Sequence, residues 1–363
     1  MDTATPEGSA SRFDSSAAAT PDSGIFGLNF HEDEATVVLL PVPFEATTSY
    51  RTGTAGGPQA ILQASRQIDL FDLQTGRPYE VGIVLLPESS EVQAWNIRAR
   101  SRAEPILEAG GVAPDRPDLL EAAAEVNAIG ARLNAWVKAE VARRLEAGKI
   151  IGVVGGDHAV PFGSIEAHAQ AFPGMGVLHV DAHADLRTAY EGFHWSHASI
   201  MANVVTRIPQ VARLVQVGIR DLCEEELDRI DGSSGRIVPH FDVDLRNRIF
   251  AGTPWLRMVQ EIVEQLPAQV YISFDIDGLD PAFCPHTGTP VPGGLSFLEA
   301  VALIEGVVAS GRRIVGFDLT EVAPGPDGDE WDGNVAARLL YKLIGFTLLS
   351  QGRITRPPRP GRN

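Results

Sequence analysis

The sequence predicts an α/β protein with three α/β/α layers, in which helices cover both faces of a mainly parallel sheet of about eight strands. Eight short apolar, β-branched runs recur along the 363 residues, and segments with helical spacing separate most of them. Unbroken apolar strands are typical of a parallel sheet that is buried on both faces. Four of the runs also end in acidic residues or histidines, and parallel strands bring such ends to one edge.

The apolar runs define the strands, and the segments between them define the helices. The runs that mark the predicted strands are 35–42, 81–86, 149–156, 174–181, 213–219, 236–241, 269–277 and 313–319. Within them, we place four of the strands at 150–154, 175–180, 269–274 and 313–319. Amphipathic spacing is clearest over 119–148 and 253–266, which we interpret as helices. A chain of this length with one set of about eight strands favours one doubly wound domain over two small ones.

The two ends and one internal stretch differ in composition from the rest. Residues 1–25 are rich in Ala, Ser, Thr and Pro without apolar periodicity, which predicts a disordered tail. Residues 351–363 are basic and Pro-rich and form a second predicted tail. We interpret 87–117 as an insertion that carries a helix, within a single domain over 26–350.

Charge and cysteine content exclude several classes of protein. The formal net charge of −17 would repel nucleic acid and anionic lipid, so a cationic small molecule is the more natural partner. No apolar stretch approaches the ~18 to 20 residues of a membrane span, which predicts a soluble protein. Cys223 and Cys284 are the only cysteines, so there is no disulfide framework, and a reducing cytoplasm is expected.

Potential metal ligands follow four of the predicted strands. They are His158 after the strand ending at 154, Asp181, His183 and Asp185 after the next, Asp275 and Asp277 after the seventh, and Glu321 after the eighth. Each motif alone has an ordinary explanation, such as a solvated turn, an Asx turn or a tight strand-to-helix connection. Their joint occurrence at the strand ends of one sheet favours a shared site.

The charge of that site predicts two metal ions. Four converging carboxylates would repel one another, and two divalent cations would balance them. Oxygen-rich ligation with some imidazole suits Mn²⁺, while Fe²⁺, Co²⁺ and Ni²⁺ are also compatible, and the lack of cysteine ligands argues against structural zinc. Two such ions, typically ~3.5 to 4 Å apart, lower the pKa of a shared water, which indicates a metal-activated hydrolase.

Three motifs resemble the signatures of the ureohydrolase family, which includes arginase and agmatinase. They are GGDH at 155–158, DAHADL at 181–186 and SFDIDGLDPAFCPHTGTPVPGG at 273–294, in the family's order and spacing. The resemblance spans roughly 37–345 and includes SYRTGTAGGPQAI at 49–61. It implies an arginase-like α/β/α catalytic domain over 26–350, two Mn²⁺ ions, with Ni²⁺ the second candidate, and a homo-oligomer that is trimeric or hexameric.

The resemblance also assigns the ligands and the catalytic residues. It implies that one metal is held by His158, Asp181, Asp185 and Asp275, and the other by His183, Asp181, Asp275 and Asp277, with Asp181 and Asp275 bridging. The expected catalytic residues are His197, Glu321 and Asp277.

The two catalytic side chains outside the ligand set have distinct expected roles. The Glu321 carboxylate pairs with the substrate guanidinium bidentately, although a loop salt bridge is the ordinary alternative. His197, in WSHASIM, protonates the leaving nitrogen, and His194 is a nearby competitor for that role.

Substrate identity depends on positions where this chain departs from the arginase pattern. Arg187 stands where arginase carries an asparagine that recognises the amino acid end of its substrate, which disfavours arginine hydrolysis. His286 replaces a small residue, and with Trp195 and Phe193 it predicts a narrower pocket. Thr289 is a further candidate contact with the substrate, or else a buried turn threonine.

The sequence is therefore compatible with several functions. The first is hydrolysis of a small cationic guanidino compound, agmatine-like or free guanidine, to urea plus an amine or ammonia. If Arg187 faces the pocket, a guanidino acid such as guanidinobutyrate becomes the alternative, and arginase activity is the third. A catalytically silent assembly subunit or a deacetylase on a related fold are the other classes. The complete ligand set disfavours both.

Overall fold

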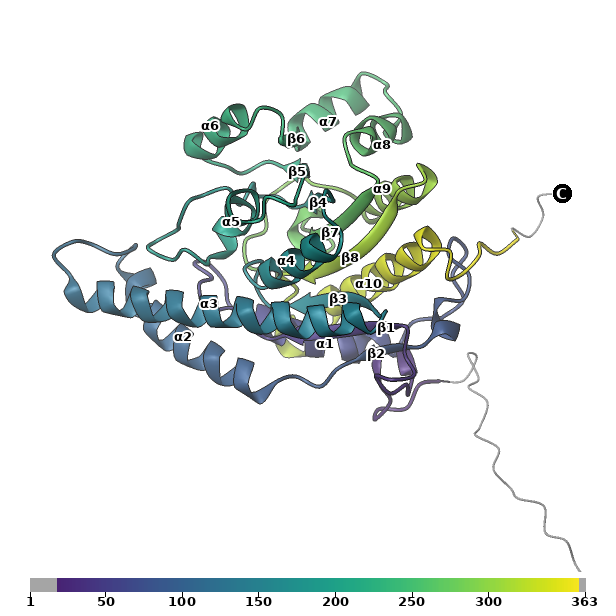
Figure 1. Ribbon diagram of the computed structural model, residues 1–363, viewed down its shortest axis with the longest axis horizontal. Coiled ribbons are helices and arrows are strands. Elements are labelled where there is room, and N and C mark those ends of the chain that lie inside the picture. Colours follow the sequence, from purple (N-terminus) through teal and green to yellow (C-terminus); the bar gives the residue numbers. More distant parts are fainter. Residues whose placement is uncertain (1–17, 359–363) are drawn as a thin grey trace, which may run out of the picture.

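All eight predicted strands are present in the computed structural model, which describes residues 18–358, and they pair in parallel in one sheet (Figure 1). The strands are β1 Val37–Val42, β2 Ile83–Leu85, β3 Ile150–Gly155, β4 Gly176–Val180, β5 Arg213–Ile219, β6 Ile237–Phe241, β7 Gln269–Asp275 and β8 Arg313–Thr320. Their order in the sheet is β2-β1-β3-β8-β7-β4-β5-β6. The predicted parallel sheet is confirmed.

Helices pack on both faces of the sheet. They are α1 Gly57–Ser65, α2 Ser90–Glu108, α3 Pro117–Glu146, α4 Phe162–Ala171, α5 Ile200–Arg207, α6 Glu224–Gly232, α7 Asp242–Phe250, α8 Trp255–Glu264, α9 Phe297–Ala309 and α10 Trp331–Ser350. Apolar residues of α1, α8, α9 and α10 belong to one core cluster, and those of α2 to α5 belong to the cores on the opposite face. This is the predicted three-layer α/β/α architecture.

Strand β1 shows how the sequence pattern produces the layers. All six of its residues are buried. Val37 and Leu39 join the core under α1 and α10, while Val38, Leu40 and Val42 join the core under α2 and α3. Because successive side chains of a strand point to opposite faces, a strand buried on both faces needs apolar residues at nearly every position.

The strand order brings the predicted ligand strands together. Strands β3, β8, β7 and β4, which carry the acidic and histidine-bearing ends, are consecutive neighbours in the middle of the sheet. Their carboxyl ends therefore form one continuous edge, which is where ligands bind in open parallel sheets.

The chain ends and the insertion are partly described. Of the predicted tail 1–25, residues 1–17 lie outside the described residues, but Ser23 and Ile25 are buried, and the Arg66 guanidinium donates to the Ser23 carbonyl at 2.6 and 3.0 Å. Packed chain thus begins before residue 26. Of the predicted tail 351–363, residues 359–363 lie outside the described residues, while Arg356 pairs with Glu305. The insertion contains α2, which packs along α3.

No helix within residues 18–358 is long and apolar enough to cross a membrane.

A buried histidine in the helical layer makes stability depend on pH. His168 of α4 has no exposed surface, and its Nδ1–H donates to the Ser164 carbonyl at 2.8 Å. Its Nε2 has no hydrogen-bond partner and packs against Gly316, where an ideal Cβ would lie only 2.2 Å from this nitrogen. Burial lowers the pKa of His168 to about 4, because a proton on Nε2 would find no acceptor.

We expect acid to destabilise the protein through His168. The pKa of an unfolded histidine is about 6.5, so the unfolded chain binds more protons between pH 4 and 6.5, and the free energy of unfolding falls as pH drops through that range. The loss attributable to this side chain should be about 3 kcal/mol, from ~1.36 kcal/mol per pKa unit. Urea denaturation at pH 7 and pH 4 would measure it, with His168→Leu as the comparison. Equal pH slopes in both proteins would contradict the assignment.

Candidate metal centre and substrate cavity

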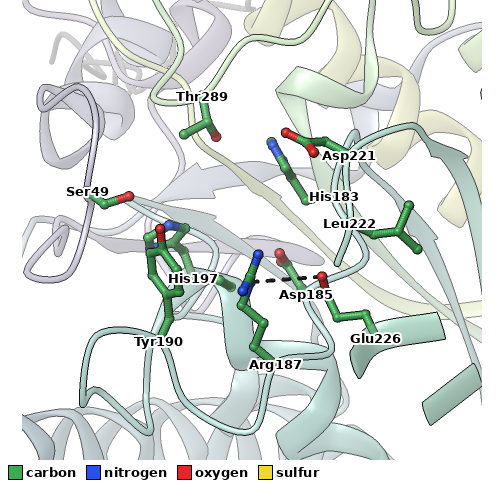
Figure 2. Close-up of a pocket in the computed structure, with 11 residues that line it drawn as sticks. Ser49, His183, Asp185, Arg187, Tyr190, His197, Asp221, Leu222, Glu226 and Thr289 are labelled. Carbon is green, nitrogen blue, oxygen red and sulfur yellow. Dashed lines mark ion pairs between the residues drawn. The ribbon is translucent and has the colours of Figure 1, made fainter. Parts of the chain in front are cut away.

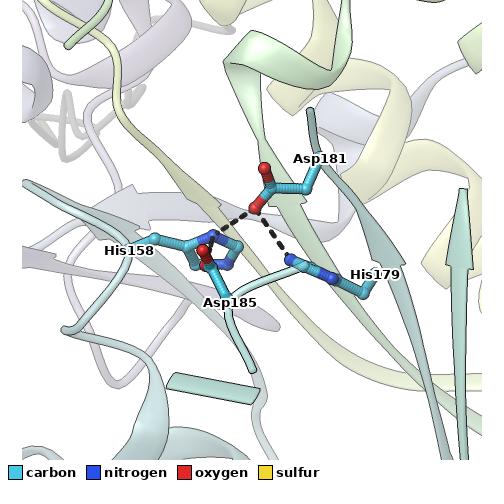
Figure 3. A group of neighbouring side chains, drawn as sticks. All are labelled: His158, His179, Asp181 and Asp185. Atoms are coloured by element: carbon cyan, nitrogen blue, oxygen red, sulfur yellow. Dashed lines mark hydrogen bonds and ion pairs between the residues drawn. The ribbon is translucent and has the colours of Figure 1, made fainter. Parts of the chain in front are cut away.

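The predicted ligands converge on His158, at the carboxyl ends of the central strands. Its Nδ1 lies 2.9 Å from Asp181 Oδ2, 3.3 Å from Asp185 Oδ2 and 3.3 Å from Asp275 Oδ2. All four side chains are at most 5% exposed. Figure 3 shows Asp181 and Asp185 directed at the His158 ring. His158, Asp181 and Asp185, with His179 beside them, form a group that could hold a metal ion. Asp275 joins this group through its contact with His158.

A second group of donors shares Asp181 with the first. His183 Nδ1 lies 3.4 Å from Asp181 Oδ1 and 3.1 Å from Asp277 Oδ2. The two oxygens of Asp181 thus face different histidines, so this carboxylate is positioned to bridge. Asp275 contacts His158 through Oδ2, while its Oδ1 accepts from the Asp277 amide at 2.8 Å. The described contacts therefore join Asp275 to the first group.

The electrostatics of these groups fit positive ions between them. Burial, followed by the charge of Asp181, raises the pKa of Asp185 to about 7. Burial and the charges of Asp277 and Asp181 raise the pKa of Asp275 well above its usual range. Carboxylates packed this closely resist ionisation together, and divalent cations would remove the repulsion. The donor chemistry therefore fits two metal ions.

Local backbone geometry presents these side chains at the strand ends. Gly156 lies where a side chain would collide with the Phe44 carbonyl, 2.0 Å from an ideal Cβ, so the turn into His158 requires glycine. Asp185 and Glu321 both adopt positive φ, at 55° and 61°. Non-glycine residues in this conformation carry strain that is commonly stored at functional sites.

His179 belongs to this centre and was missed by the sequence reasoning. It lies on β4, and its Nε2 is 2.8 Å from Asp181 Oδ2. Gln216 Nε2 donates both to His179 Nδ1 at 3.0 Å and to the Ala184 carbonyl, so Nδ1 is the acceptor and Nε2 carries the proton. His179 therefore donates to Asp181 and orients it, rather than offering a lone pair to a metal. Its position two residues before Asp181 on a strand, hence on the same face, was the available signal.

Glu321 lies beside the ligands at the end of β8. The carboxylate is 4% exposed, and its Oε1 accepts from the His158 amide at 2.9 Å. Burial, together with the negative charges of Asp157 and Asp277, raises its pKa well above the usual range. A buried carboxylate that pairs with no Lys or Arg side chain in residues 18–358 is suited to a cationic ligand.

A cavity of about 170 Å³ opens onto the metal-ligand side chains (Figure 2). It is lined by Ser49, His183, Asp185, Arg187, Tyr190, His197, Ala198, Asp221, Leu222, Glu226 and Thr289. Five of the predicted site residues line this cavity, namely His183, Asp185, Arg187, His197 and Thr289, whereas Glu321 does not. Ligand pockets usually enclose ~300 to 1,000 Å³, so this one suits a small molecule.

The cavity-lining residues differ in their partners. Thr289 Oγ1 is 3.4 Å from Asp277 Oδ2. The Arg187 guanidinium stacks over the Tyr190 ring at 5.0 Å, and its Nε lies 3.9 Å from Glu226 Oε2. Burial, followed by the charge of His183, lowers the pKa of His197 to about 4, so its imidazole is neutral near pH 7.

Two predicted substrate contacts lie elsewhere, which corrects the expected narrowing of the pocket. Trp195 packs against Gly130 and the Phe162 ring, with a ring separation of 5.0 Å, and does not line the cavity. His286 Nδ1 pairs with Asp332 Oδ2 at 2.8 Å, near the start of α10, and is also absent from the lining. Side-chain size in the sequence could not reveal which way these rings point.

The neighbours of His197 also point away from the cavity. Phe193 has no exposed surface and lies among the apolar residues of α2 and α3. His194 is exposed and lies outside the cavity lining. His197 is therefore the histidine of this segment that reaches the site.

The α/β/α fold and donor groups that could hold metal ions are compatible with a metal-dependent hydrolase, and comparison with known proteins identifies the family. The chain belongs to the arginase family, whose model matches residues 35–345. It is a ureohydrolase, a hydrolase that acts on amidino C–N bonds.

Several relatives match over nearly their full length. An N(1)-aminopropylagmatine ureohydrolase of Thermus thermophilus is 36% identical over 325 residues, 89% of this chain and 94% of the relative. An agmatinase of Cronobacter sakazakii is 31% identical, over 90% of this chain and 92% of the relative. Proclavaminate amidino hydrolase from Streptomyces clavuligerus has a similar structure, with a TM-score of 0.69, 25% identity, and coverage of 92% and 100%. Arginase from Bacillus caldovelox, 23% identical with a TM-score of 0.62 over 86% of this chain and 98% of that one, shares the fold.

Proposed function

We propose that this protein is a binuclear-metal amidinohydrolase that cleaves a small cationic guanidino compound, agmatine-like or free guanidine, to urea plus an amine or ammonia. The observation that carries the proposal is the adjacency of three features. These features lie together at one edge of the sheet. They are the buried carboxylate of Glu321, which has no basic side-chain partner among residues 18–358, the donor groups for two metals, and the small cavity.

The proposed chemistry divides between the metals and the side chains. Two divalent ions, when bound, would lower the pKa of a shared water enough to attack the resonance-stabilised guanidinium carbon. His158, Asp181, Asp185 and Asp275 would hold one ion, and His183, Asp181, Asp275 and Asp277 would hold the other, with Asp277 also among the catalytic residues.

The remaining side chains would hold the substrate and move a proton. The Glu321 carboxylate pairs with the planar guanidinium and holds its carbon in line for attack. His197, at the cavity wall and neutral near pH 7, would accept the proton that the attacking water releases and pass it to the leaving nitrogen. Thr289 contributes a hydroxyl beside Asp277.

Size and charge of the cavity support the substrate class. The volume of about 170 Å³ favours a small molecule, and the wall carries three acids, Asp185, Asp221 and Glu226, beside one arginine and two histidines. The names of the sequence relatives, agmatinase and N(1)-aminopropylagmatine ureohydrolase, agree with a cationic guanidino substrate.

Arg187 supports a guanidino acid as the second candidate. Its guanidinium lines the cavity and could bind a carboxylate such as that of guanidinobutyrate. The Tyr190 ring and Glu226 already contact this guanidinium, which reduces its attraction for an anion. A guanidino acid is therefore the second candidate substrate and not the first. Arginine, which carries both charges at its far end, ranks third.

Urea release from agmatine, N(1)-aminopropylagmatine, guanidine, guanidinobutyrate and arginine tests the proposal. We expect the highest kcat/KM with agmatine or guanidine. If the guanidino acid is the true substrate, Arg187→Gln should lower kcat/KM for guanidinobutyrate by about tenfold or more, the effect of losing a charge-assisted pair, and leave agmatine unaffected. No urea from any of the five would sink the amidinohydrolase assignment.

Metal analysis separates an enzyme from a silent assembly subunit. We propose two divalent ions per chain, Mn²⁺ first and Ni²⁺ second, because the ligand set accepts both. Chelation should abolish urea release, and add-back of each metal to the stripped protein would rank them. A purified chain that binds neither metal would favour the silent subunit.

We also propose that the enzyme acts in the cytoplasm as a homotrimer or homohexamer. Light scattering coupled to gel filtration would measure the assembly, and a monomer would contradict it.

Replacing His197 by alanine is expected to lower kcat by about a hundredfold, the usual scale for losing a general acid. Metal content should not change, because His197 is outside both donor groups. His194→Ala is the matched control, since that ring is exposed outside the cavity, and its kcat should stay within about twofold. If the two variants ranked in the opposite order, His194 would be the proton donor.

A further inference from the structure

A tight turn separates two cavity-lining side chains, Tyr190 and His197. The Tyr190 amide donates to the Phe193 carbonyl at 3.1 Å and the Phe193 amide donates back at 2.8 Å, while Glu191 and Gly192 adopt positive φ of 55° and 101°. Two consecutive positive φ values define the type I′ geometry of a two-residue hairpin turn.

The pair of helices α2 and α3, joined by residues 109–116 and here called the helical hairpin, contacts this turn. Asn127 of α3 donates through Nδ2 to the Gly192 carbonyl at 3.0 Å and accepts at Oδ1 from the His194 amide at 2.7 Å. One amide side chain thus holds the backbone on both sides of Phe193.

Apolar packing reinforces this attachment. The Phe193 ring has no exposed surface and is surrounded by residues of both helices, including Ile106, Leu119 and Val126. Trp195 lies against Gly130 of α3, where an ideal Cβ would be 2.8 Å from the Trp195 Cβ. The segment 192–195 is therefore docked on the hairpin, and His197 follows two residues later.

The other helix of the hairpin holds a second loop of the cavity. Arg100 of α2 donates through Nη1 to the Thr48 carbonyl at 2.7 Å and to the Thr48 hydroxyl at 3.0 Å. Asn96 accepts from the Glu45 amide at 2.8 Å. The next residue after Thr48 is Ser49, which lines the cavity close to Tyr190 and His197 in Figure 2.

We propose that the helical hairpin sets the geometry of the substrate cavity by clamping both loops, with Asn127 and Arg100 as positioning residues. Asn127 acts through the turn on Tyr190 and His197, and Arg100 acts through Thr48 on the wall at Ser49. The inference rests on the proposed function for its kinetic consequences. It assigns a role to the insertion at 87–117, most of which is α2.

Substitutions of Asn127 and of Arg100 are expected to change different kinetic constants. Asn127→Ala should lower kcat by about tenfold, because a displaced His197 transfers its proton less well, while KM stays within about twofold. Arg100→Ala should raise KM by about fivefold and leave kcat within about twofold, because the wall contacts bound substrate before and during reaction alike. Arg100→Lys keeps a donor for the Thr48 carbonyl and should recover most of the wild-type KM.

Hydrogen exchange measured by mass spectrometry tests the clamp without any substrate. In Asn127→Ala, amides of 188–197 should exchange faster than in the wild type, while those of the central strands should not change. Glu121→Ala is the matched control, because this exposed side chain lies on the same helix and has no hydrogen-bond or ion-pair partner within residues 18–358. Melting temperature and metal content verify that each variant is folded and loaded.

The outcomes separate this inference from the proposed function. If the wild type releases urea but Asn127→Ala changes neither kcat nor exchange of 188–197, the clamp is overturned and the enzyme assignment stands. If no substrate is hydrolysed by the wild type, the assignment fails, and exchange alone decides the clamp. A loss of kcat in the Glu121→Ala control equal to that in Asn127→Ala would also overturn it.

Discussion

Asp181→Asn is expected to abolish urea release and to lower the number of divalent ions bound per chain. The two Asp181 oxygens face His158 at 2.9 Å and His183 at 3.4 Å, so this carboxylate belongs to both donor groups. Asparagine keeps the shape but offers one oxygen and no charge. Losing several kcal/mol of transition-state stabilisation should lower kcat/KM by at least about a thousandfold.

The measurement pairs kinetics with metal analysis. Asp244→Asn provides the control, because it makes the same chemical change on an exposed residue of α7, outside both donor groups. Its metal content and kcat/KM should equal those of the wild type. Full metal occupancy with full activity in Asp181→Asn would exclude the bridging role.

Glu321→Gln is expected to lower kcat/KM by about a hundredfold or more while both metals stay bound. The substitution replaces two charge-assisted hydrogen bonds to the guanidinium, each worth ~1.5 to 3 kcal/mol, with weaker neutral ones. Glutamine is isosteric, and its amide oxygen can still accept from the His158 amide, which lies 2.9 Å from the Glu321 carboxylate. The fold and the ligand orientation should therefore survive.

The contrast between the two variants identifies what each residue does. Asp181→Asn should lose metal and activity together, whereas Glu321→Gln should lose activity alone. An unchanged kcat/KM in Glu321→Gln would mean that the buried carboxylate supports the local fold and does not bind substrate. Loss of metal in Glu321→Gln would show instead that its bond to the His158 amide holds the ligands.

Residues with a repeating local pattern were predictable, and residues whose orientation depends on packing were not. The strands could be located because each is a short apolar run, and the ligand motifs because their residue types and spacing are specific. Trp195 and His286 were expected at the cavity, but one packs on Gly130 and the other pairs with Asp332. Those partners lie far away in the sequence, beyond the reach of any local pattern.

The role of His179 also could not be predicted from local sequence spacing. Its spacing from Asp181 indicates a shared face of β4, but its role depends on Gln216 of the neighbouring strand, which determines which ring nitrogen carries the proton. Hydrogen-bond direction of this kind follows from three-dimensional neighbours.

The sequence by itself determined the class of fold, the edge of the sheet that carries the chemistry, and the donor types that suit two metals. Tertiary structure alone decided that β3, β8, β7 and β4 are adjacent, which brings the His158 and Asp275 side chains to 3.3 Å from each other. It also decided that the helical hairpin contacts both cavity loops. The physical reason is that side-chain alternation and spacing act over a few residues, whereas strand order and docking result from burying apolar surface between segments far apart in the chain.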